Sequence, residues 1–291
     1  MIYFSNAKIN LGLKIVRRRD DGYHELRSLF LPIGWSDVLE VHVIEDGMTG
    51  VIDLTIEGVE IKGDLTSNLV VKAYEMLSED FKLPKMKVTL LKRIPIGAGL
   101  GGGSSNGSFM LKAINELCKL GLCDDSLIEY AGRLGSDCPF FIRNITSEVE
   151  GRGEILNDAQ KKLETLRGKK IIVIHPGVGV STADAFKLLS ESGNIGECEF
   201  DYSDFSTFTN DFEGPISEKV PEIKEVIEFL KSLGGVYTQM TGSGSAVFSL
   251  FECPKIQGGE KHHGRQFETI EKKVAEEVKN KGWSYYSGNI I

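Results

Sequence analysis

A run of small residues from 95 to 106 is the strongest chemical signal in this 291-residue sequence. It reads PIGAGLGGGSSN, and six glycines fall within residues 97–107. Glycine lets the backbone approach a ligand closely, and a following helix points its free N–H groups and positive dipole end back at the loop. This combination is typical of a phosphate site, whereas a purely structural turn needs fewer glycines. Ser104 and Ser105 could cap the helix or reach a phosphate or metal ion.

The run differs from two better-known phosphate loops. A Walker loop needs a lysine directly after its glycines, and no lysine follows here, which excludes that loop. The spacing of Gly97, Gly99 and Gly102 matches the dinucleotide fingerprint, which belongs to a βαβ unit. Pro95 breaks the preceding strand, and the N-terminal region has a hairpin-like pattern. The dinucleotide interpretation is therefore only an alternative.

Three further stretches could carry chemistry. Asp137 lies in a loop of small residues before an aromatic segment that we predict to be a strand; its carboxylate could be a general base, a metal ligand or a turn residue. Lys8 and Asn10 are two apart on an extended segment and share a face, which a solvated strand face would explain equally well. The small residues at 241–245 could close over a ligand or form an ordinary turn.

Hydrophobic periodicity predicts the elements that must position these residues. A polar stretch follows residue 155, where we divide the chain into 1–155 and 156–291. A long loop is expected over 192–209. The predicted strands cover 9–16, 23–33, 38–44, 51–56, 87–94, 171–174 and 246–251, with a hairpin turn at 151–153, and the predicted helices cover 68–77, 104–120, 126–134, 218–233 and 265–281.

Composition excludes several classes of protein. The chain has 34 Lys and Arg against 42 Asp and Glu, a net charge of −8, which argues against a general nucleic-acid binder. A local site can still be positive and accept an anionic substrate. Five cysteines without a CxxC pair predict reduced thiols and neither a disulfide framework nor a zinc site. No signal peptide or membrane-length apolar run is seen, so we expect a cytoplasmic protein without a membrane partner.

Taken together, these stretches resemble the GHMP kinases, small-molecule kinases named after galactose, homoserine, mevalonate and phosphomevalonate. The run at 97–106 resembles the family's phosphate-binding motif, and 241–245 resembles its C-terminal glycine motif. Residues 7–11 and 19–26 narrow the resemblance to the 4-diphosphocytidyl-2-C-methyl-D-erythritol kinases of the non-mevalonate isoprenoid pathway. Further matches follow in the family's order, at 134–141, 151–155 and 210–213.

The resemblance implies a two-domain α+β GHMP kinase fold with the active site between the domains. Residues 1–155 would form a ribosomal protein S5 domain 2-like nucleotide domain, and residues 156–291 a ferredoxin-like α/β domain. The implied reaction transfers a phosphoryl group from ATP to the 2-hydroxyl of 4-diphosphocytidyl-2-C-methyl-D-erythritol. Mg²⁺ would enter the site bound to the ATP phosphates, with the hydroxyl of Ser104 or Ser105 as its protein ligand. No dedicated metal site is expected. We expect a monomer or homodimer with no nucleic-acid partner.

The resemblance also implies roles for single residues. Asp137 would take the proton of the substrate hydroxyl, and Lys8 would hold Asp137 ionised and polarise the attacking oxygen. Asn10 would contact the methylerythritol part. Tyr23 would stack on the cytosine, and His24 would offer its ring nitrogens to the polar edge of the base.

Residues outside these motifs complete the implied site. Phe186 would form a second stacking face for the base, and Thr182 would lie near the substrate diphosphate, although the segment around them lacks the family's prolines. Asn68 and Lys92 would lie on the adenine side. The ATP phosphates would be held by Pro95, Gly97, Ala98, Gly99, Leu100, Gly101, Gly102, Gly103, Ser104 and Ser105.

Besides the dinucleotide interpretation, two alternatives remain at this stage. The chain could be another member of the superfamily, such as a homoserine or mevalonate-type kinase, but those acceptors have no base for Tyr23 to stack on. It could also be a non-catalytic ligand-binding protein on the same fold. The presence of both Lys8 and Asp137 argues against that second alternative.

Overall fold

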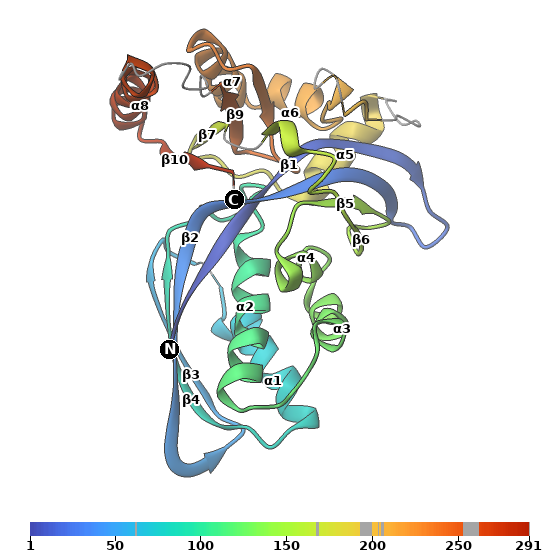
Figure 1. Cartoon of the computed structure of the whole chain (residues 1–291). Helices are drawn as coiled ribbons and strands as arrows, with labels where there is room; N and C mark the ends of the chain where they lie inside the picture. Colours follow the sequence, from blue (N-terminus) through green and yellow to red (C-terminus); the bar gives the residue numbers. More distant parts are fainter. Residues whose placement is uncertain are drawn as a thin grey trace.

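The computed structural model describes residues 1–61, 63–166, 169–192, 200–202, 204, 207–252 and 262–290. A six-stranded sheet forms its first half, in the order β3-β4-β2-β5-β6 with β1 paired to β2 (Figure 1). Only the β3–β4 pair is parallel among these strands. The strands are β1 (Ile2–Arg18), β2 (His24–Thr49), β3 (Ile52–Gly58), β4 (Pro84–Lys92), β5 (Ser147–Glu150) and β6 (Ile155–Asp158).

Helices cover one face of this sheet. A short 3₁₀ turn, η1 (Leu65–Ser67), leads into α1 (Leu69–Asp80), and α2 (Gly102–Leu117) follows the glycine run. Figure 1 shows α1 and α2 against the sheet, with α3 (Asp124–Leu134) and α4 (Cys138–Arg143) beside them. Buried side chains of β2 and β4, such as Val41 and Leu90, pack on Tyr74 and Leu111 of the helices. This apolar layer fixes α2, and with it the glycine run, on the sheet.

A four-stranded antiparallel sheet forms the second half, in the order β10-β7-β9-β8. Its helices form an outer layer, at the top of Figure 1. This strand order, with helices before β8 and before β10, is the ferredoxin-like arrangement, so the predicted α+β class is confirmed. The elements are β7 (Lys170–His175), β8 (Tyr237–Met240), β9 (Val247–Phe251), β10 (Ser284–Asn289), η2 (Glu164–Leu166), α5 (Thr182–Ser192), α6 (Glu213–Lys219), α7 (Pro221–Ser232) and α8 (His262–Lys281).

The two sheets share an apolar core. Successive residues of β7 point to opposite faces, as strand geometry requires. Ile171 and Val173 belong to a cluster that contains Ile9 and Leu11 of β1, while Ile172 packs with the outer helices. The first sheet continues through β6 to residue 158, and the division of the chain at 155 stays a prediction.

The structure differs from the predicted elements in three places. The segment after Asp137 is the helix α4 and not a strand, because Pro139 is tolerated in a first helical turn, where no N–H donor is needed. The helix predicted over 218–233 is divided into α6 and α7, since Pro221 cannot continue α6 and instead begins α7. The strands predicted over 23–33 and 38–44 are one strand, β2. Much of the loop predicted over 192–209 lies outside the described residues.

Candidate active site

The glycine run forms a loop between β4 and α2. Gly97, Gly99 and Gly101 have φ angles of 65°, 75° and 69°, a left-handed conformation that glycine adopts without strain. Gly101 is the N-cap of α2 and makes no side-chain capping bond. Of the two roles left open for Ser104 and Ser105, capping the helix is excluded, because both lie within its first turn. The first N–H groups of the helix are left for an anion, and the helix dipole favours negative charge there.

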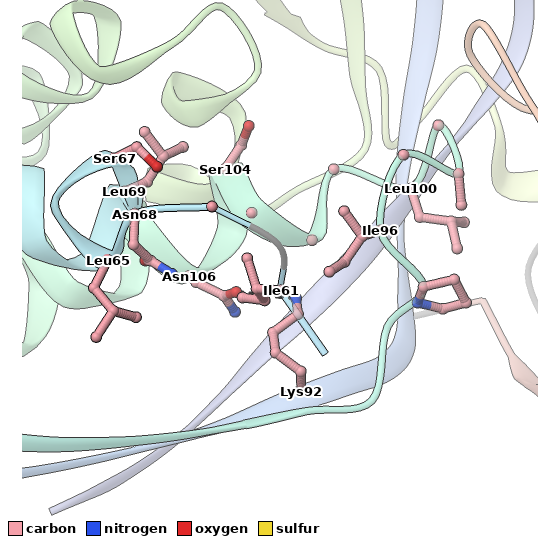
Figure 2. A pocket seen from close by; sticks show the side chains of 18 of the residues that line it. Ile61, Leu65, Ser67, Asn68, Leu69, Lys92, Ile96, Leu100, Ser104 and Asn106 are labelled. Carbon is pink, nitrogen blue, oxygen red and sulfur yellow. Dashed lines mark hydrogen bonds between the residues drawn. The ribbon is translucent and has the colours of Figure 1, made fainter. Parts of the chain in front are cut away.

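A cavity of about 370 Å³ lies on one side of the glycine loop. Figure 2 shows Asn68 on one wall and Ile96 on the opposite wall, with Lys92 between them. Asn68 also begins α1, since its side chain accepts a hydrogen bond from Val70 N at 2.9 Å. The predicted nucleotide residues that line this cavity are Asn68, Lys92, Pro95, Gly97, Ala98, Gly99, Leu100, Gly101, Gly102, Gly103 and Ser104.

Ser105 is the predicted nucleotide residue that lines neither this cavity nor the larger one described below. Its side chain is fully buried, and its Oγ has no hydrogen-bond partner among the residues that the structure describes. Ser104, one residue earlier, lines both cavities. Of the two serines, Ser104 therefore has the hydroxyl nearer to a bound ligand.

The ammonium group of Lys92 is held in a buried network. Its Nζ donates to Asp37 Oδ2 and, over 3.1 Å, to Asn106 Oδ1. Asp37 is fully buried and also accepts hydrogen bonds from Arg93 N at 2.6 Å and Ile94 N at 2.8 Å. Burial lowers the pKa of Lys92, while Asp37 acts in the opposite direction. Sequence reasoning missed Asp37, because it is 55 residues from Lys92 and no local pattern marks it.

A larger cavity, of about 860 Å³, lies on the other side of the glycine loop. Gly97, Gly99, Gly101 and Ser104 line both cavities, so the loop lies between them. The structure thus brings together all the residues that were predicted to act on the acceptor substrate. The predicted residues that line it are Lys8, Asn10, Tyr23, His24, Asp137, Thr182 and Phe186.

Lys8 and Asp137 form an ion pair on the wall of this cavity. Lys8 Nζ is 3.4 Å from Asp137 Oδ2, and their side chains are 4% and 29% exposed. The same Nζ donates to Asn10 Oδ1 at 2.6 Å and lies 4.3 Å from the ring centre of Phe30. Asp137 begins α4 without a side-chain capping bond, and none of the described residues donates a hydrogen bond to its carboxylate. The carboxylate is therefore partly exposed on the cavity wall and open to a substrate hydroxyl.

The thiol of Cys138 follows Asp137 directly. Burial raises the pKa of this thiol to about 11, so the group stays neutral beside the carboxylate at physiological pH.

Within the described residues, no three His, Cys, Asp or Glu side chains group as metal ligands do. In the same part of the chain, every helix is too short or too polar to span a bilayer.

A second glycine loop, at residues 241–245, packs against the first. Thr241 Oγ1 accepts a hydrogen bond from Asn10 N at 2.9 Å, which ties the loop to β1. A Cβ atom built on Gly99 would lie 2.1 Å from Thr241 O, so no side chain fits there. The two loops therefore touch backbone to backbone.

Asn210 and Glu213 hold the start of this second loop. Asn210 Nδ2 donates to Met240 O at 2.8 Å and to Gly242 O at 2.9 Å. Glu213 Oε2 accepts a hydrogen bond from Met240 N at 2.7 Å. Asp211, between them, binds Lys14 Nζ at 2.7 Å on β1. Residues 210–213 matched the family pattern in sequence, but no role was predicted for them.

Aromatic residues line the far end of the larger cavity. The rings of His24 and Phe186 are stacked, with centres 4.5 Å apart and planes at 15°. Burial, followed by the charge of Arg18, lowers the pKa of His24, so its ring is neutral at physiological pH. Tyr23 is 57% exposed. Thr182 Oγ1 lies 3.4 Å from Ser243 Oγ in the second glycine loop.

The turn between β5 and β6 also reaches this cavity. Arg152 and Glu154 line it, together with Ser136, although sequence reasoning assigned them no role. The match at 151–155 marked the turn without indicating a ligand. The charged residues at its tip are therefore additional candidates for the site.

Comparison with known proteins identifies the class. Residues 68–144 match the family described as GHMP kinases N terminal domain, and residues 187–280 match GHMP kinases C terminal. The chain belongs to the GHMP kinase family and is a small-molecule kinase that uses ATP.

Individual relatives narrow this class. The chain is 42% identical over 265 residues to a 4-diphosphocytidyl-2-C-methyl-D-erythritol kinase of Bacteroides fragilis, covering 86% of this chain and 92% of the relative. A crystal structure of 4-(cytidine 5'-diphospho)-2C-methyl-D-erythritol kinase has a TM-score of 0.78 at 29% identity, covering 100% of this chain and 99% of that one. Mevalonate kinase of Methanococcus jannaschii shares the fold, with a TM-score of 0.68 at 15% identity, covering 100% and 98% of the two chains. The predicted resemblance is confirmed.

Proposed function

We propose that this kinase transfers the γ-phosphoryl group of ATP to the 2-hydroxyl of 4-diphosphocytidyl-2-C-methyl-D-erythritol, a step of non-mevalonate isoprenoid biosynthesis. The observation that carries the proposal is the Lys8–Asp137 ion pair of 3.4 Å. It lies on the wall of a cavity that runs from the glycine loop to the aromatic pair of His24 and Phe186. The names of the relatives described above support the same substrate.

The smaller cavity fits the donor nucleotide. A Cβ atom built on Gly97 or Gly103 meets nothing within 4 Å, so the loop borders open space where phosphates can lie. The first turn of α2 would donate its N–H groups to them, and Asn68 and Lys92, which line the same cavity, would lie on the adenine side. When bound, ATP supplies the phosphoryl group.

This site can hold Mg²⁺ only if the protein supplies few of the ligands of the ion. The described residues hold no acidic cluster, and Mg²⁺ commonly keeps waters and phosphate oxygens in its shell. The hydroxyl of Ser104, which lines both cavities, is the protein oxygen best placed to join that shell. Bound there, the ion would neutralise charge on the phosphates.

Asp137 acts as the general base in this proposal. Its carboxylate has no competing hydrogen-bond donor among the described residues, so it can accept the proton of the substrate hydroxyl. Lys8 compensates the charge of Asp137 and, with its remaining N–H, polarises the attacking oxygen. Asn10 orients Lys8 through the 2.6 Å hydrogen bond. Phosphoryl transfer depends mainly on such positioning and charge stabilisation.

The aromatic end of the cavity favours a substrate with a base. Tyr23 offers an exposed ring for stacking, and the neutral ring of His24 offers nitrogens to the polar edge of cytosine. Mevalonate and homoserine have no base to use these groups. We further propose that the enzyme acts in the cytoplasm, as a monomer or homodimer, on small molecules and not on nucleic acid. The net charge of −8 supports the last point, because nucleic-acid binders usually carry a basic surface.

Coupled ADP release tests the proposal. The purified protein is assayed with Mg-ATP and each of three acceptors: 4-diphosphocytidyl-2-C-methyl-D-erythritol, mevalonate and homoserine. We expect release only with the cytidine substrate. Release with another acceptor would refute the substrate assignment, and folded protein inactive with all three would favour a non-catalytic binding role.

A further inference from the structure

Arg152 lies in the turn between β5 and β6, on the wall of the larger cavity. Its guanidinium carbon is 4.9 Å from the centre of the Tyr23 ring, within the range of a cation–π contact. Its side chain is 45% exposed, and its Nε is 3.6 Å from Glu154 Oε1, too far for a hydrogen bond. The guanidinium N–H groups are therefore open to a ligand.

The same turn reaches the proposed base. A Cβ atom built on Gly153 would lie 3.7 Å from Asp137 Oδ1 and 3.6 Å from Ser136 Cβ. The turn thus spans the distance from Tyr23, which would stack on the nucleobase, to Asp137, which would act on the accepting hydroxyl. In the proposed substrate, the diphosphate joins these two parts. A substrate that reaches both residues would bring its diphosphate within reach of this turn.

The charges on the cavity wall point to the same residue. Among the described residues that line the larger cavity, the lysine and arginine side chains are Lys8 and Arg152, and the carboxylates are Asp137 and Glu154. Lys8 is already paired with Asp137. Arg152 also has a carboxylate nearby, Glu154 at 3.6 Å, but its side chain is 45% exposed. Lys8 is only 4% exposed and also donates to Asn10, so Arg152 is the cation more open to an anionic diphosphate.

We infer that Arg152 binds the diphosphate of the acceptor substrate, an inference that rests on the proposed function. The planar guanidinium offers two parallel N–H groups to phosphate oxygens, a geometry that a lysine ammonium does not provide. Its contact with Tyr23 orients the fork along the cavity wall. Arg152 thereby holds the diphosphate at a fixed position between the nucleobase and the accepting hydroxyl. For this reason the site selects a nucleoside diphosphate over a nucleoside.

Binding of CDP and cytidine tests the inference. Titration calorimetry is done on the wild type, Arg152→Met and Arg152→Lys, with saturating ADP to fill the nucleotide cavity. For Arg152→Met, we expect the Kd of CDP to rise about tenfold to hundredfold, as loss of charged hydrogen bonds implies, while the Kd of cytidine stays within about twofold. Arg152→Lys keeps the charge and loses the fork, so its CDP affinity should be intermediate.

A matched control is Arg143→Met, because Arg143 pairs with Asp125 at 3.0 Å and lines neither cavity. Equal losses of CDP and cytidine affinity in Arg152→Met would mean that the residue acts only through Tyr23, and unchanged CDP affinity would remove it from the site. Either result overturns the inference while leaving the proposed function intact. A wild type that binds neither compound and releases no ADP overturns both.

Discussion

Two lysine–aspartate pairs flank the glycine loop, and their carboxylates differ in how many hydrogen bonds they already accept. In the Lys92–Asp37 pair, both side chains are buried, and Asp37 accepts from Lys92, Asn106 and two backbone N–H groups. In the Lys8–Asp137 pair, the lysine is equally buried, but the carboxylate is 29% exposed. The carboxylate of the first pair is buried and already accepts several hydrogen bonds, whereas that of the second pair lies partly exposed on the wall of a cavity.

The residue types do not explain this difference. Each lysine also donates to an asparagine, Lys8 to Asn10 at 2.6 Å and Lys92 to Asn106 at 3.1 Å. The difference lies in the carboxylate, since an oxygen that already accepts several hydrogen bonds cannot readily take a proton from a substrate. A charged pair in a fold is therefore a candidate for chemistry only where its acid keeps free lone pairs toward a cavity.

The largest expected effect is on turnover in Asp137→Asn. The amide cannot accept the proton of the hydroxyl, and general-base catalysis is worth about 10² to 10⁴ in rate, so we expect kcat to fall about 10³-fold. ATP affinity should change little, because Asp137 does not line the smaller cavity. Steady-state kinetics and nucleotide titration measure the two quantities. Activity within tenfold of the wild type would remove Asp137 from the role of base.

The second effect is on stability in Asp37→Asn. This change leaves the ammonium of Lys92 buried without its counter-charge, which costs about 3–5 kcal/mol when a buried pair loses one partner. Urea unfolding measures the loss. The control is Glu79→Gln, which breaks an exposed pair with Arg133 and should leave the unfolding midpoint close to that of the wild type. If both variants unfold alike, the Lys92–Asp37 pair has no special structural role.

The smallest expected effect is a pH dependence of the stability that Asp37→Asn loses. In the wild type, burial lowers the pKa of Lys92 and Asp37 raises it. Asp37→Asn removes the influence of Asp37, so the pKa of Lys92 in the variant is lowered by burial alone. The folded variant then binds fewer protons than the unfolded chain at pH values below the usual lysine pKa. Its free energy of unfolding should therefore rise with pH from 7 toward 10, by at most about 1.4 kcal/mol per pH unit. A loss that is equal at pH 7 and pH 9.5 would contradict this account.

Local features of the site could be predicted from the sequence because each depends on neighbouring residues. The glycine loop and the start of α2 follow from composition within a dozen residues. The shared face of Lys8 and Asn10 follows from the period of a strand, and both residues line the same cavity. The turn at 151–153 likewise joins two short antiparallel strands, as predicted.

Other features depend on residues that are distant in sequence. Asp37 meets Lys92 only because β2 and β4 pair, with Val38 opposite Leu91. The contact of Arg152 with Tyr23 depends on the folding of the β5–β6 turn against the start of β2. The aromatic segment after Asp137 was predicted to be a strand from its side chains, but tertiary packing of Phe140 and Phe141 in a buried cluster is compatible with a helix.

The close packing of the two glycine loops also limits which mutations the chain can tolerate. Gly99 excludes any side chain because Thr241 O occupies that space, while Gly103 faces open space. An alanine at 103 therefore meets no steric obstacle, whereas an alanine at 99 requires a shift of a loop 142 residues away. Part of the glycine pattern that marks a phosphate site is thus required by the fit of one loop on the other, and the two loops must change together in any variant.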